Sequence, residues 1–195
     1  MRIITGKYKG KTIKIPQGIR PTQDKVRKAL FDILGNIEGL SFLDLYAGSG
    51  AVGLEALSQE ASRVVFVEND SRCINIIKKN LGILDAACLP PACRTGRDRQ
   101  GCLMQIDVSL AIKQLAENTE RFDIIFLDPP YYQDLAKKTL KILSYYDIVS
   151  PNSLIICQHF KKDNLSDNLG DLVLFKQARY GDTILSFYRK RPVSV

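Results

Sequence analysis

The sequence predicts an α/β fold built on a mostly parallel, doubly wound sheet with helices on both faces. From residue 41 onward, short apolar runs alternate with longer stretches of helical period, which is the rhythm of repeated strand–helix–strand units. The rhythm ends in two alternating runs joined by Tyr180-Gly181-Asp182, a turn typical of an antiparallel hairpin. A chain of 195 residues, 45% of them hydrophobic, is long enough for one such core, so a single domain over residues 1–195 is expected.

Each expected element has its own local signal. The apolar runs predict strands at 42–46, 64–67, 103–106, 124–127 and 154–157, and the stretches between them predict helices at 50–59, 70–81, 108–117 and 134–144. Ahead of these, Thr22 is placed to cap a helix that Gly35 and Gly39 end. The runs at 172–178 and 183–189 predict the closing antiparallel pair. Residues 85–101 have no period and predict an irregular loop.

Positive charge is concentrated at the start of the chain. The net charge is +7, and residues 1–28 hold nine Lys or Arg against one acid, Asp24. Residues 1–20 predict a small β-hairpin extension to the core at 21–195, because the runs at 2–5 and 11–15 alternate around a glycine-bounded turn. Such a hairpin indicates a surface for a phosphate backbone, although a solvated charged face is the alternative. The candidate RNA-binding residues are Arg2, Lys7, Lys9, Lys11 and Lys14.

The composition excludes several classes of protein. No apolar run is long enough for a signal peptide or a membrane span, so a cytoplasmic protein without a membrane partner is expected. The five cysteines are odd in number and scattered, which favours reduced thiols over a disulfide framework. The cysteines and the single His159 lack the spacing of metal ligands, so no metal site is expected. We also expect a monomer.

A glycine-rich loop follows the first expected strand and opens a helix. Gly48, Gly50 and Gly53 match the spacing of a dinucleotide-binding fingerprint, and α/β sheets bind nucleotide-like ligands at this position. Glu68, after the second expected strand, supplies the acid that would bind ribose hydroxyls. The pattern of glycines and acid alone fits either NAD or S-adenosylmethionine.

Asp44 favours S-adenosylmethionine. Its carboxylate precedes the glycines, where it would repel a pyrophosphate but attract the cationic amino-acid part of S-adenosylmethionine. Asp107, at the end of the third expected strand, is placed to meet the adenine amino group, although it could also cap the next helix. The candidate cofactor-binding residues of this region are Asp44, Tyr46, Ala47, Gly48, Ser49, Gly50, Glu68, Asn69 and Asp107.

A second chemical motif, Asp128-Pro129-Pro130-Tyr131, ends the fourth expected strand. An exocyclic amino group on a base is a poor nucleophile, because its lone pair is delocalised into the ring. The Asp128 carboxylate and the Pro129 carbonyl can accept its two hydrogens and direct the lone pair at a sulfonium methyl. Tyr131, with Tyr132, can stack on a base taken out of its helix. We expect the four motif residues to be catalytic, with Asp128 also near the cofactor; a rigid proline turn is the alternative.

Several blocks of the sequence resemble one known family, the bacterial 16S ribosomal RNA guanine-N2 methyltransferases. The matching residues are Arg2-Ile3-Ile4-Thr5-Gly6, Arg20-Pro21-Thr22 with Asp24 and Val26, 44–53, Val67-Glu68, 122–131 and Tyr180-Gly181-Asp182-Thr183. The resemblance implies a Rossmann-like class I methyltransferase fold that uses S-adenosylmethionine to methylate a guanine amino group in 16S rRNA, free or within an assembling small ribosomal subunit. It further implies that Arg20 and Thr22 bind near the methionine end of the cofactor.

The sequence departs from the family pattern at two places. Gln158 stands where the family usually has Glu, and residues 85–101 are longer and richer in Cys and Arg.

Other functions stay open. The Asp-Pro-Pro-Tyr corner also serves adenine-N6 and cytosine-N4 DNA methyltransferases, the glycine fingerprint alone fits an NAD-dependent oxidoreductase, and the basic hairpin fits a non-catalytic RNA-binding assembly factor.

Overall fold

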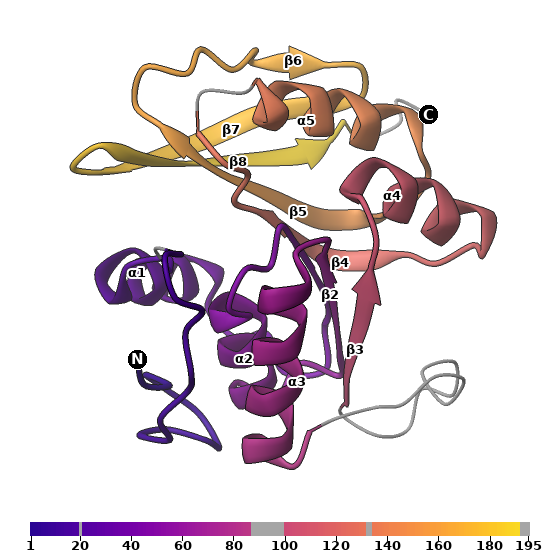
Figure 1. Ribbon diagram of the computed structural model, residues 1–195. Coiled ribbons are helices and arrows are strands. Elements are labelled where there is room, and N and C mark those ends of the chain that lie inside the picture. The colour runs from indigo at the N-terminus through magenta and orange to yellow at the C-terminus, as the bar shows by residue number, and fades with distance from the viewer. Residues whose placement is uncertain (20, 87–99, 132–133, 192–195) are drawn as a thin grey trace. The chain divides into compact units, whose positions relative to one another are not determined.

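A computed structural model describes residues 1–19, 21–86, 100–131 and 134–191 (Figure 1). The chain divides into two compact units, Met1–Asp107 and Val108–Val195. Each unit has its own strands, helices and buried side chains. A single domain over residues 1–195 stays a prediction.

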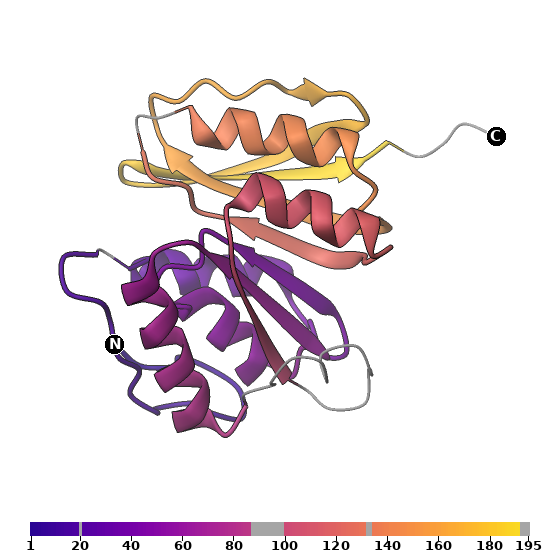
Figure 2. The ribbon, with the colours of Figure 1, turned by 45° about the vertical axis from the view of Figure 1, so that its right-hand side comes forward.

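The first unit contains three parallel strands in the order β3-β2-β1 (Figure 2). The strands are β1 (Ser41–Leu45), β2 (Arg63–Glu68) and β3 (Gln100–Gln105), and the helices are α1 (Asp24–Leu34), α2 (Ala51–Ser58) and α3 (Ser71–Leu84). The inner residues of β1 and β2 are buried, as is usual for parallel strands covered by helices. α2 packs on all three strands, and α3 packs on β3.

One glycine lets α2 lie close to the sheet. All residues of α2 are buried, and a Cβ placed on Gly53 would lie 2.3 Å from the Phe66 ring of β2. Carbon atoms do not approach so closely, so a larger residue at this position would push the helix away from the strand. The helix starts after Gly50, whose φ of 77° lies in the left-handed region that favours glycine.

The N-terminal loop, residues 1–19, pairs with itself around one isolated bridge. Arg2 and Thr12 form an isolated antiparallel bridge, and backbone hydrogen bonds donated by Ile3 and Ile13, both of 3.0 Å, flank it. Ile3 and Ile13 are each 2% exposed. The predicted hairpin is therefore wrong in its extent, because the loop buries its apolar side chains and directs several of its amides at neighbouring side chains rather than at a partner strand.

The tip of the loop binds the end of α2. The Ser58 carbonyl accepts a hydrogen bond of 2.7 Å from the Lys7 amide, and the Ser58 hydroxyl accepts one of 2.9 Å from the Tyr8 amide. A Cβ on Gly6 would lie 1.9 Å from the Ser58 carbonyl oxygen, so only glycine permits this approach. The loop is thus bound to α2 within the first unit.

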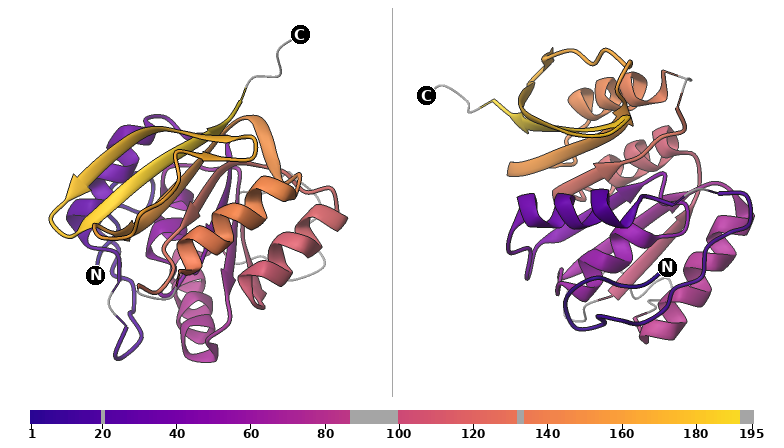
Figure 3. Two further views of the ribbon diagram at one scale, coloured as in Figure 1. Left: turned by 90° about the horizontal axis from the view of Figure 1, so that it is seen from above. Right: turned by 90° about the vertical axis from the view of Figure 1, so that its left-hand side faces the viewer.

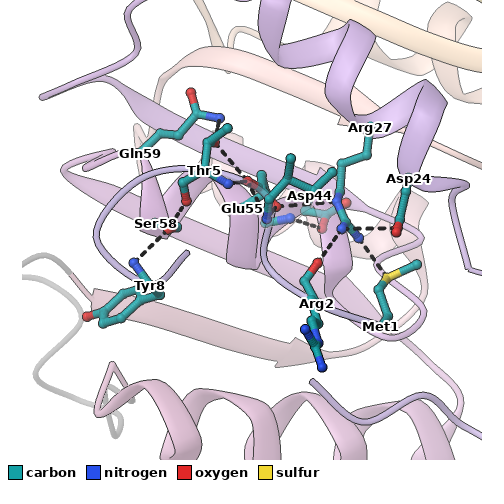
Figure 4. A network of polar contacts seen from close by, with 12 residues as sticks. Met1, Arg2, Thr5, Tyr8, Asp24, Arg27, Asp44, Glu55, Ser58 and Gln59 are labelled. Atoms are coloured by element: carbon teal, nitrogen blue, oxygen red, sulfur yellow. Dashed lines mark hydrogen bonds and ion pairs between the residues drawn. The ribbon is translucent and has the colours of Figure 1, made fainter. Parts of the chain in front are cut away.

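A buried ion pair joins the loop, α1 and α2 (Figure 4). The Glu55 carboxylate of α2 accepts hydrogen bonds from the amides of Ile4 and Thr5 and from the Thr5 hydroxyl, at 2.7 to 3.1 Å. Arg27 Nε of α1 lies 3.3 Å from Glu55 Oε2, close enough for an ion pair although it is not aligned as a hydrogen bond. Burial lowers the pKa of Arg27, while the charges of Glu55 and Asp24 act to raise it. Arg27 and Glu55 thereby fix the N-terminal loop to α2, the helix that follows the glycine-rich turn.

The second unit contains five strands in the order β4-β5-β8-β7-β6. The strands are β4 (Phe122–Leu127), β5 (Val149–Phe160), β6 (Asn168–Leu169), β7 (Leu172–Tyr180) and β8 (Thr183–Lys190), and the helices are α4 (Val108–Glu117) and α5 (Leu135–Tyr145). β4 and β5 are parallel, whereas β5, β8, β7 and β6 pair antiparallel, and Figure 3 shows β7 and β8 as a long hairpin. α5 packs on β5 and against α4.

The predicted α/β fold with parallel strands and a closing antiparallel hairpin is confirmed. Three details are wrong. Helix α1 has Gln23, not Thr22, at its N-cap, and its first turn is supported by an ion pair of 3.2 Å between Asp24 and Arg27. β5 runs well beyond 154–157, because it also pairs along β8. The short strand β6 was not expected.

The expected loop at 85–101 is described only in part. Residues 100 and 101 belong to β3 rather than to a loop, and residues 87–99 lie outside the described residues. Cys102 is disulfide-bonded, so the expectation of five reduced cysteines is wrong there, whereas Cys73 and Cys157 are free and buried. Among the described residues, no helix has the length and apolar character that crossing a membrane requires.

Candidate functional site

The glycine turn after β1 is built from left-handed backbone. Tyr46, Gly48 and Gly50 have φ values of 61°, 55° and 77°. The Ala47 amide donates to the Val67 carbonyl of β2 at 3.0 Å, and the Gly50 amide donates to the Ala47 carbonyl at 2.7 Å. A positive φ is unusual for tyrosine and is found most often where a site requires it. The glycine fingerprint in the sequence predicted the glycines of this turn, but it did not predict that Tyr46 would have a positive φ.

The Asp44 side chain fixes the end of this turn by a hydrogen bond to α2. The side chain is 2% exposed, and its Oδ2 accepts a hydrogen bond of 2.9 Å from the Gly53 amide in the first turn of α2. A carboxylate at a helix N-terminus is favoured by the helix dipole. Asp44 therefore fixes the start of α2, and a direct contact with a cofactor ammonium stays a prediction.

Glu68 ties the glycine turn to the end of β2. Its Oε2 accepts a hydrogen bond of 2.8 Å from the Gly48 amide, and its Oε1 accepts from the amides of Asn69 and Asp70 at 2.8 and 2.9 Å. The structure thus brings Glu68 and the glycine turn together, and the binding of ribose hydroxyls by Glu68 stays a prediction. Ser49, in the same turn, is 3% exposed, and its carbonyl accepts a hydrogen bond of 3.2 Å from the Asn80 amide group of α3.

Asp107 lies at the same edge of the sheet. The register pairs Glu68 with Gln105, and the Ile106 amide donates to the Glu68 carbonyl at 3.1 Å, so Asp107 follows directly at the carboxyl end of β3. It is exposed. Of the two residues assigned to the methionine end of the cofactor, Thr22 lies two residues before α1 and Arg20 lies outside the described residues.

The Asp-Pro-Pro-Tyr corner follows β4, at the carboxyl end of that strand. Asp128 is half-buried, and its Oδ2 accepts a hydrogen bond of 2.8 Å from Gln158 Nε2 at the end of β5. Pro129 is buried and Pro130 is exposed. Sequence reasoning noted Gln158 only as a departure from a family pattern. The sequence alone gave no signal for this contact, because it requires β4 and β5 to be neighbours in the sheet.

The Tyr131 side chain contacts the start of β8 and the end of β5. Its hydroxyl lies 3.3 Å from Thr183 Oγ1, and its ring centroid lies 5.9 Å from that of Phe160 with the planes tilted by 39°. A cavity of about 240 Å³ opens beside the corner. Its lining includes Pro129, Pro130, Tyr131, Lys137, His159 and Lys162. Tyr132, the second expected stacking residue, lies outside the described residues.

The single histidine is held inside the second unit. His159 Nδ1 lies 3.0 Å from the Phe160 carbonyl, which can only accept, so Nδ1 carries the hydrogen and Nε2, 2.8 Å from Ser186 Oγ, is the acceptor. Burial lowers the pKa of His159, which favours this neutral form. Within the described ranges, no group of three or more His, Cys, Asp or Glu side chains could hold a metal ion.

Two lysines of the N-terminal loop (residues 1–19), called the basic loop below, lie over one aromatic ring. Lys7 Nζ and Lys11 Nζ lie 5.4 and 5.3 Å from the centroid of the Tyr8 ring. Lys7, Lys9 and Lys11 are all exposed, and Lys11 Nζ also donates to the Ile83 carbonyl at 3.2 Å. The two remaining cations assigned to RNA, Arg2 and Lys14, are exposed as well.

These features define a class of protein. The strands of each unit's parallel pairs end in chemical motifs. β1 is followed by the glycine turn that Glu68 holds, and β4 is followed by the Asp-Pro-Pro-Tyr corner. This combination characterises a Rossmann-like methyltransferase fold. The family model described as Conserved hypothetical protein 95 matches residues 1–189, and the chain belongs to that family.

Named relatives and a solved structure agree with this family. The chain is 34% identical to ribosomal RNA small subunit methyltransferase D of Haemophilus influenzae over 80% of this chain and 76% of the relative. It is 30% identical to the Escherichia coli protein of the same name over 97% and 90%. The structure of Thermus thermophilus hypothetical protein TTHA0928 matches with a TM-score of 0.80 at 31% identity, over 97% of this chain and 99% of that one. The family resemblance predicted from the sequence blocks is therefore confirmed.

Proposed function

We propose that the protein transfers a methyl group from S-adenosylmethionine to the exocyclic N2 amino group of a guanine in 16S rRNA of the small ribosomal subunit. The observation that carries the proposal is the Asp128 corner. A carboxylate fixed at a strand end, followed by two prolines and an aromatic ring beside a cavity, is suited to present a base amine. Relatives named ribosomal RNA small subunit methyltransferase D support rRNA as the substrate class.

The first unit has a cradle that fits S-adenosylmethionine. The left-handed turn through Gly48 and Gly50 leaves the backbone without a Cβ where a ligand would approach. Glu68 would bind the ribose hydroxyls, Asp107 the adenine amino group, and the buried charge of Asp44 would favour the cationic methionine end. When bound, the cofactor supplies a methyl group activated by its attachment to a sulfonium sulfur.

The corner residues would direct the amine. The Asp128 carboxylate and the Pro129 carbonyl would accept the two hydrogens of the amine, and Tyr131 would stack on the base. One bond forms between the amine nitrogen and the methyl carbon while the bond between that carbon and sulfur breaks. The products are S-adenosylhomocysteine, the N2-methylated guanine and one proton, which leaves the nitrogen for water.

The basic loop would bind the phosphate backbone. Lys7 and Lys11 lie over the Tyr8 ring, so charge and an aromatic side chain occur together where RNA would bind. The partner that we propose is 16S rRNA or an assembling small ribosomal subunit in the cytoplasm, bound by a monomer without a metal.

The decisive experiment identifies the product. Purified protein and labelled S-adenosylmethionine are incubated with free 16S rRNA and with isolated small subunits from cells that lack the protein, and the RNA is digested to nucleosides for mass spectrometry. We expect N2-methylguanosine. N6-methyladenosine or N4-methylcytidine would overturn the guanine assignment, and RNA that takes up no label from either substrate would overturn methyl transfer altogether.

A variant of the corner separates catalysis from RNA binding alone. Asp128→Ala should lower turnover by more than tenfold while the Kd for S-adenosylmethionine changes little, because the carboxylate acts on the amine. Activity within tenfold of wild type corresponds to less than about 1.4 kcal/mol of transition-state stabilisation and would contradict the proposed role of Asp128.

A further inference from the structure

Gln158 and Asp128 meet at the ends of neighbouring parallel strands. The β4–β5 register pairs Leu127 with Cys157, so the residues that follow them come side by side. Gln158 Nε2 donates a hydrogen bond of 2.8 Å to Asp128 Oδ2. Gln158 is 5% exposed and Asp128 is half-buried, so the bond is partly shielded from water, which strengthens a hydrogen bond to a charged acceptor.

The other end of the same amide is unsatisfied. Gln158 Oε1 is buried and has no hydrogen-bond partner within the described part of the chain. The amide gains nothing by turning round, because Oε1 would then face the Asp128 carboxylate as acceptor against acceptor. An apolar side chain of similar length would avoid the unsatisfied oxygen. Stability alone therefore does not explain an amide here, and groups retained at such a cost are typical of functional sites.

We propose that Gln158 is a positioning residue for methyl transfer, which holds the Asp128 carboxylate in the orientation that accepts the hydrogens of the target amine. The inference rests on the proposed function. With Oδ2 bound to the amide, the carboxylate is restrained from rotating about its terminal torsion, so its remaining lone pairs keep one direction. The amide gives up no proton to Asp128 under ordinary conditions, and Gln158 forms and breaks no covalent bond in the step.

The test replaces the amide with an apolar side chain of similar length. Gln158→Met should lower the single-turnover rate of methyl transfer to RNA at least tenfold, while the Kd for S-adenosylmethionine and the KM for RNA stay within twofold of wild type. If Gln158→Met shows no thermal unfolding transition and is therefore not folded, Gln158→Leu, whose side chain has a similar volume, takes its place. Gln177→Met is the matched control, because Gln177 Nε2 donates to Ser186 Oγ at 2.9 Å in the same sheet and not to Asp128.

A double-mutant cycle then asks whether Gln158 acts through Asp128. In an Asp128→Asn background, adding Gln158→Met should change the residual rate by less than twofold, because the carboxylate that the amide positions is already gone. A role of Gln158 in general folding would instead reduce the rate by the same factor in both backgrounds.

The possible results are distinguishable. Wild-type protein that methylates neither rRNA nor small subunits overturns the proposed function and this inference with it. Wild-type protein that methylates guanine while folded Gln158→Met and Gln158→Leu stay within twofold of its rate overturns the inference alone. Equal losses with and without the Asp128 carboxylate also overturn it.

Discussion

Glu68 Oε2 accepts a hydrogen bond of 2.8 Å from the Gly48 amide, so the acid that ends β2 and the glycine turn that follows β1 behave as one structural piece. The Glu68 carboxylate also receives the Asn69 and Asp70 amides. A carboxylate offers roughly four lone-pair sites, so three amide bonds leave room for a further donor such as a ribose hydroxyl. The same side chain can therefore shape the cradle and contact its ligand.

Glu68→Gln should weaken binding of S-adenosylmethionine roughly 10- to 100-fold, because hydrogen bonds to a charged group contribute about 1.5–3 kcal/mol. Isothermal calorimetry measures the Kd. Glu117→Gln is the control, since Glu117 is an exposed α4 acid whose 3.9 Å ion pair with Lys113 lies along one helix. A Kd for Glu68→Gln within twofold of wild type would show that the acid does not bind the cofactor.

Glu55→Ala should destabilise the folded protein by about 3 kcal/mol, the lower end of the range for removing one partner of a buried ion pair. The substitution leaves the Arg27 guanidinium buried and also removes the acceptor of the Ile4 and Thr5 amides. Urea unfolding followed by circular dichroism measures the loss.

Asp32→Asn provides the comparison for Glu55. Asp32 forms an ion pair of 3.0 Å with Lys28, but both side chains are exposed, so its removal should change the free energy of unfolding by less than about 0.5 kcal/mol. Equal effects of the two substitutions would mean that the Arg27–Glu55 pair contributes no more than a surface pair.

The sequence was sufficient for the parallel strands and their helices, because these depend on local patterns of apolar residues. β2 was expected at 64–67 and spans Arg63–Glu68, and α4 was expected at 108–117 and spans Val108–Glu117. The N-terminal loop was not predictable in this way. Its form depends on Glu55 and Ser58, more than 40 residues away along the chain, and local periodicity carries no record of such contacts.

The candidate site shows the same division. The glycine turn and Glu68 were predicted together, because a motif of fixed spacing requires both. The hydrogen bond from Gln158 to Asp128 joins residues 30 positions apart and depends on strand order, which the sequence pattern alone leaves open. Pairs that only the sheet topology brings together are therefore the part of the site that needed the structure.

Neutralising the basic loop should weaken RNA binding and reduce its dependence on salt. Each lysine that contacts a phosphate contributes close to one unit to the slope of log K against log salt, so Lys7, Lys9 and Lys11 changed together to Gln should reduce the slope by up to about three. Filter binding at several salt concentrations measures the slope. The same substitution at Lys113, Lys138 and Lys141 on α4 and α5 controls for net charge, and a slope unchanged by the loop variant would assign its lysines to a solvated surface.

His159 should make stability depend on pH below neutrality. It is the single histidine of the chain, and burial lowers its pKa below the ordinary value of 6.5, although the Phe160 carbonyl and the charge of Asp163 oppose the shift. As the pH falls through 6.5, the unfolded chain takes up a proton before the folded one does, so the contribution of neutral His159 is present above pH 6.5 and is lost below it.

Comparison with His159→Gln isolates this contribution, because glutamine keeps hydrogen-bonding capacity near Ser186 Oγ but does not titrate. The free energy of unfolding of wild type minus that of the variant should be constant from pH 8 to 7 and should decrease from pH 6.5 to 5. Hydrogen bonds from the Arg72 side chain and amide lower the pKa of Asp70 to about 2, so the loss of stability through that carboxylate begins at lower pH than this range. A difference that stays constant down to pH 5 would mean that His159 titrates alike in the folded and unfolded chains, and that its bond to Ser186 does not depend on the neutral ring.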